Sequence, residues 1–300
     1  MKPRTFPLSG DARRQHGFSL VELAMVLLVV GFLAALFLPA TNTMLDNNRR
    51  KETRAKLEAL EAAMTRFVMT NQRLPCPADG SLGPTDADYG RESVVTGVCT
   101  ANELLNGVAP WRTLAIPQES ATDAWNNLIS YRVWAGVANS LTLANGMDMT
   151  ACDPNGAATT DVGACRADNT TSPLNWLTVD SSVNARGFRA CNASPCAVGG
   201  LEELTSKANG NGVAYFLISH GSNKFGAFSA NGTLLPVNGP GPGPLENINS
   251  NGIALRTAAP NDFYIDAEFD ENTASYYDDI VLRPTVIKVA LDAGLGPRVP

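Results

Sequence analysis

The chain has 300 residues, of which 44% are hydrophobic and 17% charged, and its formal net charge is -6. This length allows one large domain or two small ones, and the composition is ordinary for a chain that folds mostly in water. Removing residues 1–17 would leave 19 basic and 28 acidic residues, a net charge of -9. Such a balance argues against a phosphate-binding surface, so we expect no nucleic-acid partner.

The first element is an apolar run, Phe18–Leu38, whose only charged residue is Glu22. As a helix, its 21 residues would reach about 31 Å, enough to cross a bilayer core. By the positive-inside rule the basic side stays in the cytoplasm and the rest of the chain lies outside. The basic residues before the run are Lys2, Arg4, Arg13 and Arg14.

Three interpretations of this segment compete. A cleaved signal peptide has an apolar region of about 7–15 residues, shorter than this run, and Leu38-Pro39-Ala40 is a poor small-x-small cleavage site. An uncleaved anchor explains the length but not Glu22, because an acid within a bilayer costs about 2.5–3.5 kcal/mol. If the carboxyl group lay close enough to the membrane–water interface to stay hydrated, this would explain only why the acid is tolerated.

The third interpretation comes from a resemblance. The run Gly17-Phe18-Ser19-Leu20-Val21-Glu22 resembles the processing signal of type IV pilins and type II secretion pseudopilins. The resemblance implies that a membrane-embedded peptidase cuts after Gly17 and methylates the new amine of Phe18. Glu22 becomes the fifth mature residue and Pro39 the twenty-second, where relatives carry a helix-bending proline. It implies that Glu22 and Pro39 act in assembly.

Helical spacing continues beyond the apolar run. Leu57, Leu60, Met64, Phe67 and Val68 fall on one face of a helix, which should end near Arg73 because prolines follow at 75 and 77. A separate coiled coil would need sustained heptads, which are absent. We therefore predict a leader at 1–17, an N-terminal helix at 18–73 with a transmembrane part at 18–38, and a head at 74–300.

The head contains short strand-like runs and many turn signals. The region from Ala135 to Gly212 is predicted to be a loop insertion, and Pro236–Pro244 a surface loop. The predicted fold class is α+β: one long helix, transmembrane in its first half and amphipathic in its second, packed on an antiparallel sheet with loop insertions. The predicted strands are Leu128–Trp134, Val213–Ser219, Phe225–Ser229, Phe263–Ala267 and Ile280–Leu282.

All six cysteines follow the apolar run, which suits disulfides in an exported domain. Fifteen connectivities are possible, and sequence proximity favours Cys76–Cys99, Cys152–Cys165 and Cys191–Cys196. Free buried thiols or a metal site are the alternative, but no CxxC pair or nearby histidine supports zinc.

A second resemblance lies in the head, where four landmarks are similar, at larger spacings, to those of the major pseudopilin. It implies a calcium site between the S-x-G loop, at 219–224, and the terminal acidic segment, at 278–280, although Asn223 stands where an aspartate is usual. The favoured alternative is a solvated acidic surface, since the acids match no EF-hand. We therefore assign no metal ligand and expect no cofactor, with calcium left open. The landmarks are Arg73-Leu74-Pro75, Asp123–Asn127 with Tyr131, Ser219–Lys224 and Asp278-Asp279-Ile280.

An enzyme is not expected. After loss of the leader His220 is the only histidine, it lies in a turn-like Gly/Ser/Asn segment, and no G-x-S-x-G elbow or phosphate-binding glycine motif is present.

The predicted function is that of a structural subunit, a minor pilin or pseudopilin, of a type IV pilus or type II secretion filament. Its expected partners are other such subunits, the prepilin peptidase and methyltransferase, and the bacterial inner membrane, with the head in the periplasm before assembly. The alternative is a membrane-anchored binding module or adhesin exported by the pilin pathway.

Overall fold

The computed structural model describes residues 19–95, 98–135, 141–150, 187–205, 207, 211–236, 241, 243–252 and 263–296, without the side chains of residues 34–42. The chain divides into two compact units, Met1–Asn48 and Arg49–Pro300. Helix α1, Leu20–Asn71, begins in the first unit and ends in the second.

Helix α1 ends two residues before the predicted stop, Arg73. Gln72 adopts a left-handed conformation with φ 53°, and its N–H donates to the carbonyl of Val68 at 2.8 Å. This conformation stops a helix while still satisfying one of its last carbonyls. The extended segment that follows carries Pro75 and Pro77, neither of which has an amide hydrogen to continue the ladder.

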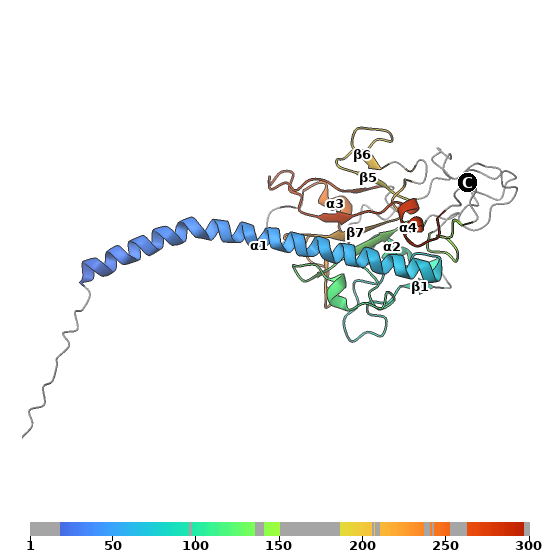
Figure 1. The fold of residues 1–300 in the computed structure, drawn as a ribbon, viewed down its shortest axis with the longest axis horizontal. Coiled ribbons are helices and arrows are strands. Elements are labelled where there is room, and N and C mark those ends of the chain that lie inside the picture. The colour runs from blue at the N-terminus through green and yellow to red at the C-terminus, as the bar shows by residue number, and fades with distance from the viewer. Residues whose placement is uncertain are drawn as a thin grey trace, which may run out of the picture. The chain divides into compact units, whose positions relative to one another are not determined.

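Within the second unit the predicted apolar face of α1 is confirmed. Leu57, Leu60, Met64 and Val68 are at most 1% exposed, and Phe67 is partly buried against the same core. Figure 1 shows this part of α1 running along the sheet of the head. The 3.6-residue period therefore identifies the buried face correctly, because one stripe of a helix can pack on a sheet.

The central sheet is antiparallel, with strand order β10-β7-β4. Its strands are β4, Ser130–Val133, β7, Tyr215–Ser219, and β10, Ile280–Leu282. Alternate residues of β7 enter different cores: Tyr215 and Leu217 join the core that includes α1, whereas Phe216 and Ile218 join a second core. Both faces of β7 are thus covered, which explains its unbroken apolar run at 215–218.

A second three-stranded sheet, with order β6-β5-β9, was not predicted. It consists of β5, Arg189–Cys191, β6, Glu203–Thr205, and β9, Phe263–Ile265, and β5 pairs with β9 in parallel. The prediction that Ala135–Gly212 holds only loops is therefore wrong at β5 and β6, and the sheets are not all antiparallel. Strands of three residues are too short to show a period of two.

The remaining elements are short. The predicted strand Leu128–Trp134 is divided between β3 and β4, and Phe225–Ser229 is a strand only at its end, β8. Three helices that the structure describes beyond α1 were not predicted. These elements are β1, Val94–Val95, β2, Val98–Cys99, β3, Asn127–Leu128, β8, Phe228–Ser229, α2, Ala101–Asn106, α3, Glu246–Asn249, α4, Val286–Asp292, and a 3-10 turn, Gln118–Ala121.

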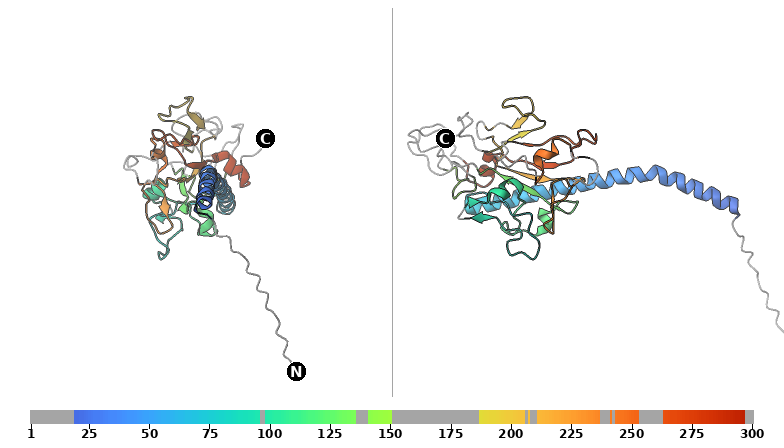
Figure 2. Two further views of the ribbon diagram at one scale, coloured as in Figure 1. Left: turned by 90° about the vertical axis from the view of Figure 1, so that its left-hand side faces the viewer. Right: turned by 180° about the vertical axis from the view of Figure 1, so that it is seen from behind.

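Helix α4 lies beside the second half of α1, as both views in Figure 2 show. Thr285 caps it by accepting a hydrogen bond from the N–H of Lys288. The Lys288 ammonium lies 2.6 Å from Glu61 on α1 and 2.7 Å from Asp292. Val286 and Val289 face the core, so α4 packs against the same core as the helix that begins the head.

Two disulfides lie within the described residues, and both join pairs that proximity favours. Cys76–Cys99 ties the exit from α1 to β2, and Cys191–Cys196 closes a loop after β5. Cys152 and Cys165 lie outside the described residues. In the chain-entropy model, closing a loop the size of the first contributes about 3–4 kcal/mol.

The contact between α1 and the sheet predicts a large effect at Leu60, which is fully buried. Leu60→Ala should lower the free energy of unfolding by about 2–5 kcal/mol, since it removes apolar contacts and leaves a cavity. Met69→Ala, on the same helix at a side chain 56% exposed, is the matched control and should change it by less than about 0.5 kcal/mol. Denaturant unfolding of both variants checks the difference, and equal losses would contradict this packing.

Candidate functional site

The start of α1 is held by a reciprocal pair of hydrogen bonds between Ser19 and Glu22. The N–H of Glu22 donates to Ser19 Oγ at 3.2 Å, and the N–H of Ser19 donates to Glu22 Oε2 at 3.5 Å. This is a capping box, which satisfies two helix N–H groups that have no intrahelical acceptor. The S-x-x-E spacing is visible in the sequence, although Glu22 was predicted to act only in assembly.

The apolar side chains that follow are exposed. Between Leu20 and Leu33 the large hydrophobic side chains are 47–85% exposed, on every side of the helix. Gly17 and Phe18 lie outside the described residues, as do the side chains of residues 34–42, which include Pro39. Among the residues described, no helix is both long and apolar enough to span a membrane.

A second candidate site lies in the head, where three buried carboxyl groups converge. Glu246 on α3 and Asp278 and Asp279 before β10 each have a carboxylate oxygen within 4.8 Å of the others. Their exposed fractions are 1%, 1% and 7%. The prediction of a solvated acidic surface is therefore wrong for Asp278 and Asp279. Both precede Ile280, which pairs with Ser219 on β7, and this pairing places them beside the loop that follows β7.

The loop after β7 wraps around one carboxylate. Asp278 Oδ2 accepts from the N–H and hydroxyl of Ser222, at 2.6 and 2.7 Å, from the N–H of Asn223 at 3.0 Å, and from the Tyr276 hydroxyl at 3.1 Å. Gly221, with φ 54°, makes this approach possible, because a Cβ there would collide with the Asp278 side chain.

Glu246 closes the cluster from α3. Its Oε1 accepts from the N–H of Asp278 at 3.0 Å and its Oε2 from the Asn223 amide at 2.8 Å. Burial, reinforced by the neighbouring Asp279, raises the pKa of Glu246 to about 8. An aspartate at 223 would bring a fourth carboxylate here, whereas Asn223 donates a hydrogen bond. Glu246 was not predicted as a site residue, because it stands alone between Pro/Gly-rich and Asn-rich segments.

The D-x-W-x-N turn contacts the start of the same loop. Asp123 Oδ1 accepts from the N–H groups of Trp125 and Asn127, both at 2.9 Å, and its Oδ2 accepts from the Ser219 hydroxyl at 2.7 Å. Burial raises the pKa of Asp123 although these donors oppose the change. Asp123 and Ser219 lie 96 residues apart in the sequence, so this hydrogen bond joins the turn directly to the loop that follows β7.

His220 lies between a hydroxyl and a carboxylate. Its Nε2 is 2.9 Å from Ser130 Oγ, and its Nδ1 is 3.4 Å from Asp279 Oδ1. The order of groups resembles a Ser-His-Asp triad, but the three side chains are at most 7% exposed. A nucleophile must reach its substrate, so we interpret these contacts as links between β4, β7 and β10.

Hydrogen bonds do not account for every oxygen of the carboxyl cluster, and a divalent cation would account for the remaining one. Asp278 Oδ1 is buried and has no hydrogen-bond partner among the described residues. Three converging carboxylates with one oxygen left over form an oxygen-rich donor set of the kind that calcium takes. A cation here would be held by Glu246, Asp278 and Asp279, and its charge would offset the repulsion among them.

Comparison with known protein families finds a match at the N-terminus. The prokaryotic N-terminal methylation motif matches residues 12–38. The chain is 32% identical over 68 residues to "Type II secretion system core protein G" of Klebsiella pneumoniae, which is 23% of this chain and 49% of that protein. It is 33% identical over 100 residues to "Type IV major pilin protein PilE1" of Neisseria gonorrhoeae, 31% of this chain and 61% of that protein.

The chain thus spans about half to three fifths of the length of these curated relatives. No solved structure matches it. The N-terminal segment therefore carries a methylation motif of the prepilin type. The motif and the relatives together support a place for this chain in the pilin and pseudopilin family.

Proposed function

We propose that this protein is a structural subunit of a type IV pilus or type II secretion filament, a minor pilin or pseudopilin whose leader is removed after Gly17. The observation that carries the proposal is the methylation motif at residues 12–38 followed by a helix with exposed apolar side chains. Burying each large aliphatic or aromatic side chain contributes about 1.5–3 kcal/mol, so this helix requires an apolar environment. The inner membrane supplies it before assembly, and the helices of neighbouring subunits supply it in the filament.

Glu22 gives this association its register. Cleavage places a cationic amine at Phe18, four residues before the carboxylate. In a filament core of low dielectric an unpaired carboxylate is costly and a paired one is tolerated. A neighbour that brings its own amine to Glu22 is therefore favoured over one displaced along the axis.

Fractionation of cells tests the proposal. Filaments sheared from the surface, or the pseudopilus recovered after crosslinking, should contain this protein together with other pilin-like subunits. An integral inner-membrane protein with no pilin segment is the control and should be absent. Recovery only from membranes, with a soluble ligand bound to the head, would favour a membrane-anchored adhesin instead.

We further propose that calcium occupies the cluster of Glu246, Asp278 and Asp279. A ligand that binds only the folded protein raises its stability by mass action, so a chelator should lower the melting temperature and added calcium should restore it. Asp278→Ala should abolish the calcium-dependent shift. The matched control, Asp270→Ala, alters an aspartate of the same segment that lies outside the cluster and should keep the shift. A melting temperature unchanged by chelator would contradict calcium binding.

A further inference from the structure

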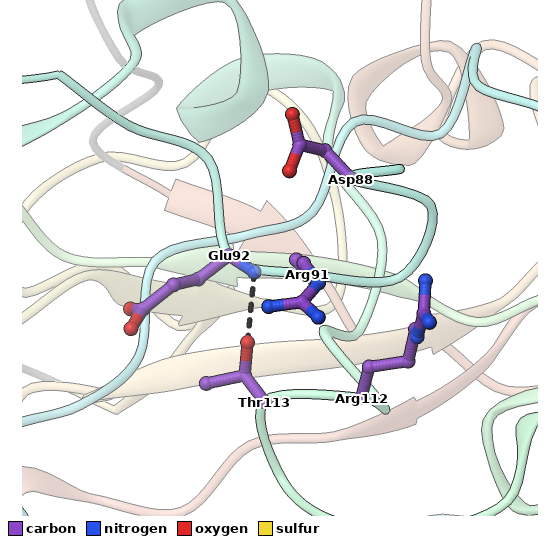
Figure 3. A pocket seen from close by; sticks show the side chains of 5 residues that line it. All are labelled: Asp88, Arg91, Glu92, Arg112 and Thr113. Atoms are coloured by element: carbon purple, nitrogen blue, oxygen red, sulfur yellow. Dashed lines mark hydrogen bonds between the residues drawn. The ribbon is translucent and has the colours of Figure 1, made fainter. Parts of the chain in front are cut away.

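An open pocket of about 410 Å³ lies on the head, between the loop 88–92 and residues 112–113. Its five lining residues are all charged or hydroxylated: Asp88, Arg91, Glu92, Arg112 and Thr113. Figure 3 shows them around the opening, with the Arg91 guanidinium between Thr113 and Arg112 in this view. The volume is that of a site for a small ligand, and the lining suits a polar one.

The walls of the pocket are held in place by packing behind them. Tyr89 and Trp111 pack edge to face with ring centroids 4.8 Å apart. Gly90, with φ 71°, lies against the Trp111 ring, where a Cβ would collide, and its carbonyl accepts from the N–H of Arg112 at 2.9 Å. The N–H of Glu92 donates to Thr113 Oγ1, also at 2.9 Å. The two segments therefore form one preorganised wall.

One of the two carboxylates in the lining already has a cationic partner. Glu92 accepts both ends of the Arg73 guanidinium, at 2.9 and 2.7 Å, and the N–H of Cys76 at 3.0 Å. Burial alone would raise the pKa of Glu92, but these donors lower it below the ordinary value. Glu92 is thus ionised and paired outside the pocket.

Within the described part of the chain, the two arginines in the lining have no such partner. Arg112 Nη1 donates to the carbonyls of Ala87 and Tyr89 at 3.2 and 3.3 Å, which orients the guanidinium and leaves its other N–H groups for a ligand. Among the residues that the structure describes, no carboxylate lies within 4.0 Å of the guanidinium of Arg91 or Arg112. Thr113 Oγ1 accepts from Glu92, so its own hydrogen can be donated.

The unpaired charges in the pocket are two cations and the single anion of Asp88, which matches a ligand with one negative charge. Guanidinium groups bind planar oxyanions through paired hydrogen bonds, and a carboxylate carries the matching single charge. Asp88 and Thr113 can bond hydroxyl groups of the same ligand. We propose that this pocket binds a carboxylated sugar, a hexuronate unit of an acidic polysaccharide, through Arg91 and Arg112. Such a site goes beyond a structural role in a filament.

Calorimetric titration of the full-length protein in detergent with trigalacturonate tests this assignment. Arg91→Gln should weaken binding roughly tenfold to a hundredfold, because it removes a charge-assisted hydrogen bond. Arg112→Gln should do so at least as strongly. Arg66→Gln, at an exposed arginine of α1, is the matched control and should bind as the unaltered protein does. The methyl ester of the same trisaccharide, which lacks the charge, should not bind.

Three results would overturn the assignment. The first is no binding of trigalacturonate by the unaltered protein, and the second is equal affinity in Arg91→Gln. The third is tighter binding of inorganic phosphate or of an acidic dipeptide than of the sugar. Since none of these assays involves filaments, their failure would leave the proposed structural function intact.

Discussion

Replacing Glu22 by glutamine is expected to leave the precursor cleaved but to exclude the protein from filaments. Glutamine serves as well as glutamate in a capping box, so the start of α1 should persist. The variant removes only the charge, and the amine of Phe18 would then be buried without a partner. Breaking a buried ion pair from one side costs about 3–5 kcal/mol, a factor of roughly 10²–10⁴ in an association constant. The yield in sheared filaments, measured against the membrane pool, reports this loss.

Two companion variants separate charge from helix capping. Glu22→Ala removes both and should also fail to assemble. Ser19→Ala removes the hydroxyl that accepts from the N–H of Glu22 but keeps the carboxylate, at a cost of about 1 kcal/mol. It should therefore assemble nearly as well as the unaltered protein. If the Glu22→Gln variant assembled as well as the unaltered protein, the charge-pairing mechanism would be wrong, even if the protein were a pilin.

Replacing Gly17 by tryptophan is expected to stop processing almost completely. A peptidase that cuts after residue 17 must bring its catalytic groups close to that backbone, and only glycine offers a peptide without a side chain. The variant should remain in the membrane at its full precursor length and be absent from filaments. The intact mass of the membrane-bound protein measures the outcome.

A matched change in the same leader gives the control. Gly10→Trp places an equal bulk seven residues earlier and should be processed normally. Normal cleavage of Gly17→Trp, or a block in both variants, would show that Gly17 is not the recognised residue.

The sequence predicts the long elements well because they repeat a pattern over many residues. The apolar face from Leu57 to Val68 spans three turns, and the continuous apolar run of β7, at 215–218, spans four residues, so both signals can be recognised in the sequence. The stop of α1 was predicted from its prolines to within two residues. Strands of three residues such as β5 and β6 carry no comparable signal, and their pairing depends on residues distant in the chain.

The candidate sites divide in the same way. Glu22 stands out because a charge within an apolar run is visible in the sequence alone. The cluster in the head was predicted only in part: Asp278 and Asp279 were named as exposed acids, and Glu246 was missed. Glu246 bonds the N–H of Asp278, 32 residues further along the chain, and both side chains are buried. Neither the contact nor the burial is visible in the local sequence, so acids that were expected on the surface form a buried carboxyl cluster.

The identity of the mature N-terminus tests the central claim most directly. We would isolate sheared filaments and determine the first residue of this chain by mass spectrometry of its N-terminal peptide. A filament subunit should begin at an N-methylated Phe18. A chain that begins at Thr41, as after signal peptidase, or one that keeps Met1 and never enters the sheared fraction, would contradict it.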